Sequence, residues 1–466
     1  SELCFFDGGP QTTEISSLRV RSILVKILRQ WCSWFRAGDL RGRFFMTWGS
    51  SNLNLMASSV YSLGMVALVV RELGVTELGL WTLIVQLTTY LGLLDAGVTS
   101  ACIRRFVGPI AKKESGDFPQ MFQAACMVTC VQGLACWLCL AAVPLLADLL
   151  QIPPALRPIF IKVMICQGFL TGLFFVLRPF TALLLAAQRF ETNNFLGAAG
   201  SLASLFIIGV SLKAGAGLWS LVWTTLFQQS LGAITTLAMV HRLKLVPSAW
   251  RLGQWPWGRI RILFLESLDF FSWSGFTTLN AAMQSVFLSR FMGLEAVALW
   301  NVGSKFVILF YTFISSSLNN AFPTLTEVFE LGHVAKCRDL CRRFLLWSLA
   351  GAGGLGSCYV LANGWLVRIW TAGLLSFPFS LSVMLAAWLL LATAVRALAC
   401  FTNVWHQRNA MRRGPMVESV FFALGLSLAL LSPGLWTLGV ALLVSQIAPL
   451  LFVYLPSWKK VAAGKA

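Results

Sequence analysis

The 466-residue chain has few charged side chains and very little histidine. Only 12% of its residues are charged, about half the share in a typical soluble domain, whereas 57% are hydrophobic. It contains three histidines, no His-Glu-x-x-His motif and no phosphate loop of the Gly-x-x-x-x-Gly-Lys-Ser/Thr type. These absences argue against a soluble globular protein, an ATPase with that loop and a zinc hydrolase with that motif.

The apolar residues are gathered in long runs that short polar gaps separate, and the mean hydropathy is +0.75. Runs of about 20 residues are long enough to cross a hydrocarbon core about 30 Å thick. The sequence therefore predicts an all-α membrane protein with twelve transmembrane helices. The predicted spans are 44–70, 78–101, 119–147, 159–187, 195–212, 218–240, 263–289, 297–323, 344–369, 380–405, 415–432 and 436–456.

The basic residues fall mostly on one side of this arrangement. Of the 36 Lys and Arg residues, 27 lie in the even-numbered gaps between spans or in the two terminal segments. By the positive-inside rule, this bias predicts that both termini and the even-numbered gaps lie in the cytosol. The net charge of +18 then reflects membrane topology, and we expect no nucleic-acid partner.

A short sequence pattern, Gly-Leu-Trp followed by Thr or Ser and then Leu, occurs three times. The copies are 79–83, 217–221 and 434–438, and a weaker copy occupies 298–302. Each copy opens an apolar segment. We expect these tryptophans to lie at the membrane–water interface, where the indole body is in lipid and its N–H stays hydrated.

Other matches at a nearly constant offset indicate that six helices were duplicated. Arg71 matches Arg290, and Gln188-Arg189 matches Gln407-Arg408, both at an offset of 219. An even number of helices per unit gives two lobes of the same orientation, related by a parallel repeat. The predicted domains are a basic cytosolic segment (1–43), an N-terminal lobe (44–240), a cytosolic linker (241–262), a C-terminal lobe (263–456) and a cytosolic tail (457–466).

Three basic residues lie deep within predicted spans, namely Arg178, Lys305 and Arg396. An unpaired charge facing lipid near mid-depth is unfavourable by at least about 2.5–3.5 kcal/mol. Arg178 and Arg396 are nearly equivalent in the two halves, and Gln86 is the counterpart of Lys305. One interpretation is a cationic central cavity that binds an anion such as phosphate, for which Arg supplies a planar set of donors.

The other interpretation is that these cations neutralise buried acids. The candidate acids are Asp95, Glu266, Asp269 and Glu418, which lie toward the cytosolic ends of their spans by the predicted topology. Asp95 and Glu418 are also candidates for ion coupling. Both interpretations remain open at the level of sequence.

The segment from Arg71 to Arg105 resembles the N-terminal signature of bacterial polysaccharide-biosynthesis flippases, the O-antigen and exopolysaccharide translocases of the multidrug/oligosaccharidyl-lipid/polysaccharide exporter superfamily. It contains Glu77-x-Gly79-Leu80-Trp81 and Leu94-Asp95-x-Gly97, and Gln188-Arg189-Phe190 is similar to that family as well. The resemblance covers roughly residues 44–456. In the second half Ala298 replaces the glycine and no Asp matches Asp95.

This resemblance implies two lobes in a V around a central cavity. It also implies a non-enzymatic flippase that moves a polyprenyl-pyrophosphate-linked oligosaccharide from the inner to the outer leaflet of a bacterial inner membrane by alternating access. Arg178, Lys305, Arg396 and Gln86 are the candidate substrate-binding residues. We expect no bound cofactor, with coupling to protons, sodium or the membrane potential. The expected partners are the lipid-linked substrate, the bilayer and a polysaccharide polymerase or export complex.

Three alternatives were weighed against this function. A cation-coupled multidrug exporter of the same superfamily would place acids deep inside its N-terminal lobe, whereas the deep charges here are basic. A membrane glycosyltransferase would need a catalytic loop outside, yet the longest outer gap, 148–158, has Asp148 as its only acid. A lipid II flippase, a near relative, typically has more than twelve spans.

Overall fold

The computed structural model describes residues 40–112, 116–187, 189–247, 256–405 and 407–462. Every regular element in these residues is a helix, which confirms the all-α prediction. The predicted basic segment 1–43 lies almost entirely outside the described residues.

The first half of the chain forms helices that are interrupted in several places. They are α2 (Leu40–Glu72), α3 (Val75–Gly92), α4 (Val98–Lys112), α5 (Phe118–Cys139), α6 (Val143–Leu149), α7 (Arg157–Phe175), α8 (Arg178–Ala186), α9 (Phe190–Lys213) and α10 (Trp219–Arg242). Short 3-10 turns at Leu93–Asp95 and Leu140–Ala142 continue α3 and α5.

The second half forms longer and mostly continuous helices. They are α11 (Trp257–Met292), α12 (Leu294–Glu330), α13 (Val334–Trp370), α14 (Phe379–Val404), α15 (Arg408–Ala429), α16 (Leu435–Pro449) and α17 (Leu455–Ala462), with a π-helical turn at Leu450–Tyr454. α11 begins inside the predicted linker 241–262.

Nine helical segments among the described residues are long and apolar enough to cross a membrane. They correspond to nine of the twelve predicted spans. The remaining three predicted spans, 218–240, 263–289 and 415–432, coincide with α10, α11 and α15, which are helical but are not among the nine. A multi-pass helical membrane protein is therefore confirmed, and the count of twelve stays a prediction.

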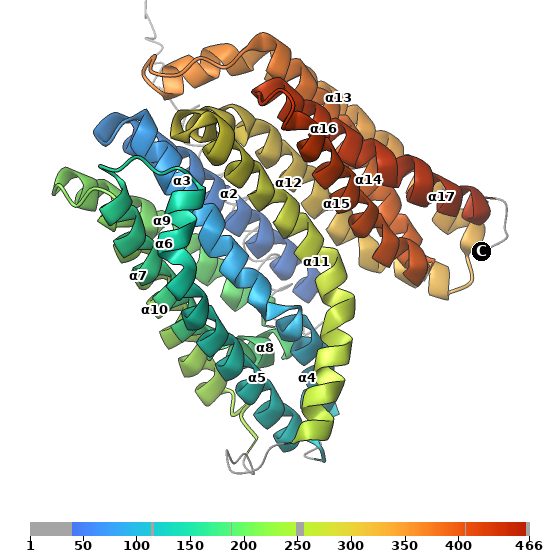
Figure 1. Cartoon of the computed structure of the whole chain (residues 1–466). Coiled ribbons are helices and arrows are strands. Elements are labelled where there is room, and N and C mark those ends of the chain that lie inside the picture. Colours follow the sequence, from blue (N-terminus) through green and yellow to red (C-terminus); the bar gives the residue numbers. More distant parts are fainter. Residues whose placement is uncertain (1–39, 113–115, 188, 248–255, 406, 463–466) are drawn as a thin grey trace, which may run out of the picture.

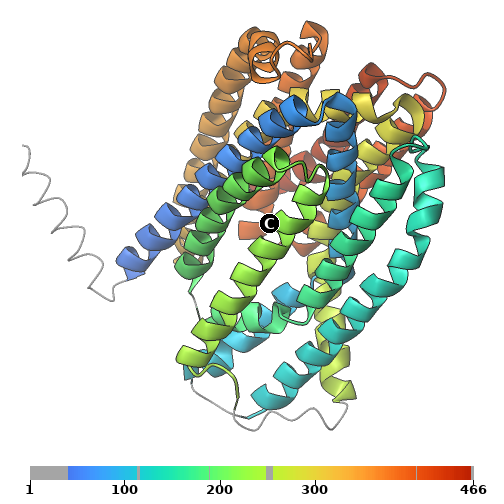
Figure 2. The same ribbon diagram turned by 90° about the vertical axis from the view of Figure 1, so that its left-hand side faces the viewer.

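The helices form two lobes that meet along α3 and α12 (Figure 1; Figure 2). In the first lobe α2 packs along α9, and α7 packs against α3, α5 and α10. In the second lobe α14 packs against α12, α13 and α16, and α15 packs along α16. α11 touches both lobes, because it contacts α3, α4 and α5 as well as α12 and α15.

The contact between α3 and α12 is very close. A Cβ atom placed on Gly79 would lie 2.0 Å from the carbonyl oxygen of Leu294, so only glycine fits there. One turn along α3, Thr82 Oγ1 accepts a 2.7 Å hydrogen bond from Asn301 Nδ2. The first residue of the Gly-Leu-Trp pattern thus serves lobe-to-lobe packing.

The prediction that the tryptophans of this pattern lie at the membrane–water interface is wrong for two of the four. Trp81 is 1% exposed and Trp300 is 6% exposed, so neighbouring helices cover both side chains. The Trp300 indole N–H donates to Gln284 Oε1 at 3.2 Å. By contrast, Trp436 is 53% exposed and Trp219 is half-buried.

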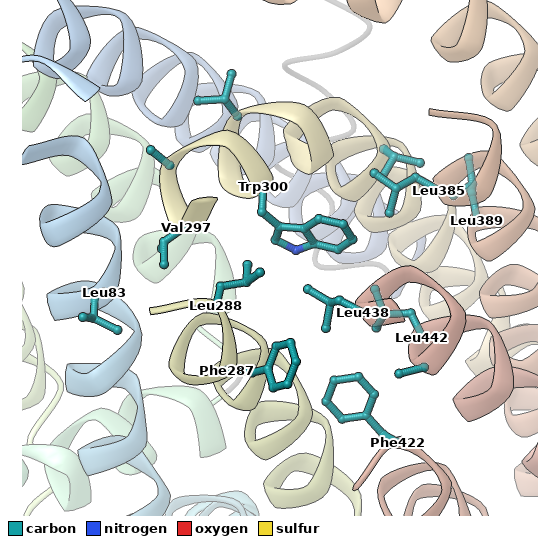
Figure 3. Close-up of a cluster of buried hydrophobic side chains, with 14 of the residues drawn as sticks. Leu83, Phe287, Leu288, Val297, Trp300, Leu385, Leu389, Phe422, Leu438 and Leu442 are labelled. Atoms are coloured by element: carbon teal, nitrogen blue, oxygen red, sulfur yellow. The ribbon is translucent and has the colours of Figure 1, made fainter. Parts of the chain in front are cut away.

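The main apolar core continues from the first lobe into the second. Figure 3 shows part of it, where Leu83 of α3, Leu288 of α11 and Trp300 of α12 lie between the two lobes. A separate apolar cluster occupies one end of the first lobe, formed by α4, α8 and the adjoining ends of α5, α10 and α11. The first lobe is therefore divided in a way that the sequence pattern did not predict.

Candidate functional site

Two helix breaks in the first lobe bring Asp95 and Arg178 together. α3 ends in a 3-10 turn that contains Asp95, and Ala96 (φ 47°) and Gly97 (φ 79°) redirect the chain into α4. α7 ends at Phe175, and α8 restarts at Arg178. Arg178 Nη1 lies 2.7 Å from Asp95 Oδ1.

Other groups surround this ion pair. Thr99 Oγ1 donates to Asp95 Oδ1 at 2.7 Å, and Gln132 Nε2 donates to the Asp95 backbone carbonyl at 3.1 Å. The Arg178 guanidinium lies 3.8 Å from the ring centroid of Phe175. Arg178 is therefore neutralised and held in the first lobe, as the structural interpretation of the deep charges expected.

A polar cavity lies elsewhere, between α3 and the second lobe. It has a volume of about 380 Å³, within the range of ligand pockets, and is enclosed by α3, α11, α12, α14, α15 and α16. Gln86, Arg396 and Glu418 all line it. The structure thus brings together three of the residues that the sequence analysis selected.

The two charged residues of the cavity already have hydrogen-bond partners. Arg396 Nη2 donates to Asn319 Oδ1 at 2.7 Å. Glu418 Oε1 accepts from Gln446 Nε2 at 2.8 Å and, more weakly, from Asn280 Nδ2 at 3.5 Å. Among the described residues that line the cavity, one cation and one acid balance each other.

The other predicted site residues lie outside this cavity. Lys305 is half-buried on α12, beside the lining residue Ser304, and forms no hydrogen bond or ion pair within the described part of the chain. Arg178 and Asp95 belong to the pair in the first lobe. The substrate and coupling roles given to all these residues stay predictions.

Sequence reasoning missed the aromatic rings of the cavity and the amides that α11 contributes to it. Trp300 and Tyr311 reach it from α12 and Trp388 from α14, while Asn280 and Gln284 come from one face of α11. The signal was present in part, since Asn280 and Gln284 are polar residues four positions apart in an apolar segment.

At the end of the molecule that carries the linker, two ion pairs fasten α11 to the first lobe. Arg105 of α4 pairs with Glu266, and its Nε donates to Glu266 Oε2 at 2.9 Å. Asp117, directly before α5, pairs with Arg259. The beginning of α11 is therefore held by the first lobe although its chain continues into the second.

Comparison with known proteins identifies relatives of this architecture. The family model described as polysaccharide biosynthesis protein matches residues 48–329, more than half of the chain. No curated protein matches the chain in a comparison of sequences.

Several solved structures have a similar fold. An inward-facing multidrug resistance MATE family transporter of the MOP superfamily has a TM-score of 0.67 and 11% identity, over 89% of this chain and 98% of that one. Lipid II flippase MurJ, in an inward closed conformation, has a TM-score of 0.65 and 11% identity, over 89% of this chain and 90% of that one. A variant of the Vibrio cholerae MATE transporter VcmN has a TM-score of 0.58 and 16% identity, over 90% of this chain and 97% of that one. At these identities the likeness establishes the two-lobed fold of that superfamily.

Proposed function

The chain belongs to the polysaccharide biosynthesis protein family, and from this premise we propose that it is a flippase for a polyprenyl-pyrophosphate-linked oligosaccharide. It moves the substrate from the inner to the outer leaflet of a bacterial inner membrane. The single observation that supports this proposal is the polar cavity between the lobes, which is lined by Arg396, Gln86 and Glu418.

The physical problem of such a substrate is its head group. Transferring an isolated charge into hydrocarbon costs tens of kcal/mol in idealised estimates, so sugar and pyrophosphate need a polar path. The polyprenyl chain is apolar and stays in the lipid. A polar cavity at a lobe interface provides such a path without enclosing the lipid tail.

Transport then requires alternating access, in which the lobes rock about their contact at α3 and α12. A ligand shifts such an equilibrium only by binding one state more tightly than the other. Arg396 of α14 attracts the pyrophosphate. Lys305 of α12 supplies a second positive charge. Glu418 and Asp95 are the candidate groups for coupling to protons or sodium.

The orientation follows from the basic residues. The end with Arg105, Arg259 and the linker faces the cytosol, and both termini lie on that side, because the positive-inside rule favours it. A polysaccharide polymerase or export complex is the proposed partner on the outer side, where the flipped substrate would be consumed.

The test is transport in liposomes with a fluorescent polyprenyl-pyrophosphate oligosaccharide. Wild type is expected to accelerate its transbilayer movement, and Arg396→Ala to slow it by roughly 10- to 100-fold, since a hydrogen bond to a charged group contributes about 1.5–3 kcal/mol. Arg343→Ala is the control, because it removes a cation from an exposed pair with Asp339. Equal movement by wild type and empty liposomes would refute the proposal.

A cation-coupled multidrug exporter is the second candidate, and the acid in the cavity favours it. Glu418 lies among aromatic side chains, a suitable environment for an apolar cation. Ethidium efflux from the same liposomes separates the two functions. Gradient-driven ethidium transport without movement of the lipid-linked glycan would select the exporter.

A further inference from the structure

Two buried polar atoms on the cavity wall have no hydrogen-bond partner within the described part of the chain. They are Oδ1 of Asn280 on α11 and Nε1 of Trp388 on α14. Asn280 is only 7% exposed, so its side chain is nine-tenths buried and still faces the cavity. Leaving such groups unpaired is unfavourable, so a ligand that supplies matching groups would be stabilised here.

The chemistry of these two atoms is complementary. Asn280 Nδ2 is turned toward the Glu418 carboxylate, so Oδ1 is left as an acceptor. Trp388 Nε1 can only donate. A hydroxyl group both donates and accepts and can satisfy either atom, whereas a fully ionised phosphate accepts only and cannot bind Asn280 Oδ1.

The charged groups of the cavity do not change this preference. Arg396 and Glu418 are already engaged by Asn319 and Gln446 at 2.7 and 2.8 Å. The two unpartnered atoms, Asn280 Oδ1 and Trp388 Nε1, are by contrast neutral and suit an uncharged polar group of the substrate.

Aromatic rings form the rest of the recognition surface. Trp300 points into the space between α11, α14 and α16 in Figure 3, and it lines the cavity. Tyr311 and Trp388 lie side by side with ring centroids 5.4 Å apart and planes inclined at 52°. The electron-rich face of an aromatic ring attracts the C–H groups on the apolar face of a sugar ring.

We propose that this cavity is a sugar subsite, in which Asn280 and Trp388 bind the hydroxyl groups of one uncharged sugar residue and Trp300 and Tyr311 pack against its ring. The proposal rests on the proposed function and adds the part of the substrate that the second lobe recognises. The pyrophosphate is left to Arg396, which lines the same cavity.

The experiment compares lipids that differ only in the sugar. The full chain in lipid nanodiscs is titrated with undecaprenyl pyrophosphate, and with the same lipid bearing one N-acetylglucosamine, one glucose or one galactose. At least one sugar-bearing lipid is expected to bind wild type several-fold more tightly than the sugar-free lipid. Trp388→Phe, which keeps a ring and removes the donor, is expected to weaken that binding about 3- to 10-fold while leaving the sugar-free lipid unaffected.

Asn280→Ala is expected to give a similar selective loss. Trp347→Phe is the matched control, because Trp347 is 77% exposed on α13 and does not line the cavity. Thermal unfolding of each variant verifies that it is folded.

Each other outcome has a distinct meaning. If wild type binds every lipid equally, or if Trp388→Phe weakens all of them alike, the sugar subsite is wrong while the flippase proposal stands. If wild type binds none of the lipids, the proposed function itself fails.

Discussion

Asn301 donates a 2.7 Å hydrogen bond to Thr82, and the two residues are 219 positions apart, the offset that relates the two halves of the sequence. Equivalent residues of a two-fold repeat touch only where the symmetry axis passes between them. The approximate axis of this molecule therefore runs through this pair, between α3 and α12. In the proposed rocking of the lobes, we expect this contact to be the pivot.

The close approach beside this pair leads to the first prediction. Gly79→Ala places a Cβ 2.0 Å from the carbonyl oxygen of Leu294, and the backbone on both sides must shift. We expect this overpacking to lower the free energy of unfolding by about 1–3 kcal/mol. Thermal unfolding of the purified protein measures it.

The matched control is Gly232→Ala in α10, where an added Cβ meets no atom within 4 Å. Alanine is the better helix former there, so stability is expected to stay constant or rise by up to about 1 kcal/mol. If the two variants unfold alike, the contact between α3 and α12 is looser than described.

The ion pair of the first lobe gives the second prediction. Asp95→Asn and Arg178→Ala are each expected to reduce stability by about 1.5–3 kcal/mol, because each leaves a part-buried charge without its partner. The double variant is expected to be less destabilised than the sum of the two. A double-mutant cycle on unfolding free energies measures this coupling, and additive losses would show that the pair contributes little.

The sequence predicted the helical lobes and their repeat, because hydropathy and a fixed offset are local or periodic signals. It could not decide between pairing and a cavity for the deep arginines. Arg178 and Asp95 are far apart in the chain, and their contact depends on positive φ at Ala96 and Gly97. That geometry has no periodic signature.

The absence of a second-half counterpart to Asp95 was visible in the sequence, and it explains why the two arginines differ. α12 continues without a break, and Arg396 therefore meets Asn319 and lines the cavity, whereas Arg178 meets a carboxylate. Arg178 and Arg396 occupy equivalent positions, but their surroundings differ because Asp95 is present in the first half and has no counterpart in the second. The tryptophan pattern misled for a related reason, since the burial of Trp81 and Trp300 depends on neighbouring helices and cannot be read from one helix.

The lobes also meet near the end opposite the linker, where the third prediction applies. Trp370 Nε1, at the end of α13, donates to the Leu63 carbonyl of α2 at 3.0 Å, and Ser289 Oγ donates to the Leu150 carbonyl at 3.3 Å. Trp370→Phe removes one of these bonds. It is expected to shift the equilibrium toward a form open at this end, by roughly 2- to 12-fold.

Hydrogen exchange followed by mass spectrometry measures this shift. Peptides from the ends of α2 and α13 are expected to exchange faster in Trp370→Phe. Trp365→Phe, at a 65% exposed position on the same helix, is the control and is expected to behave as wild type. Unchanged exchange in both variants would mean that Trp370 does not hold the lobes together.

The two candidate coupling acids lead to opposite expectations, which is the fourth prediction. Asp95 already neutralises Arg178. Binding a proton or another cation to the Asp95 carboxylate would first break this ion pair. Within the described part of the chain, Glu418 accepts hydrogen bonds from the neutral amides of Asn280 and Gln446, and it is the better placed of the two acids to take up a proton or sodium. Transport by Glu418→Gln is therefore expected to lose its response to an imposed pH or sodium gradient, while Asp95→Asn keeps that response at reduced stability. Glu295→Gln, at an exposed position in the first turn of α12, is the control. A gradient response that survives in Glu418→Gln and disappears in Asp95→Asn would assign coupling to the first lobe instead.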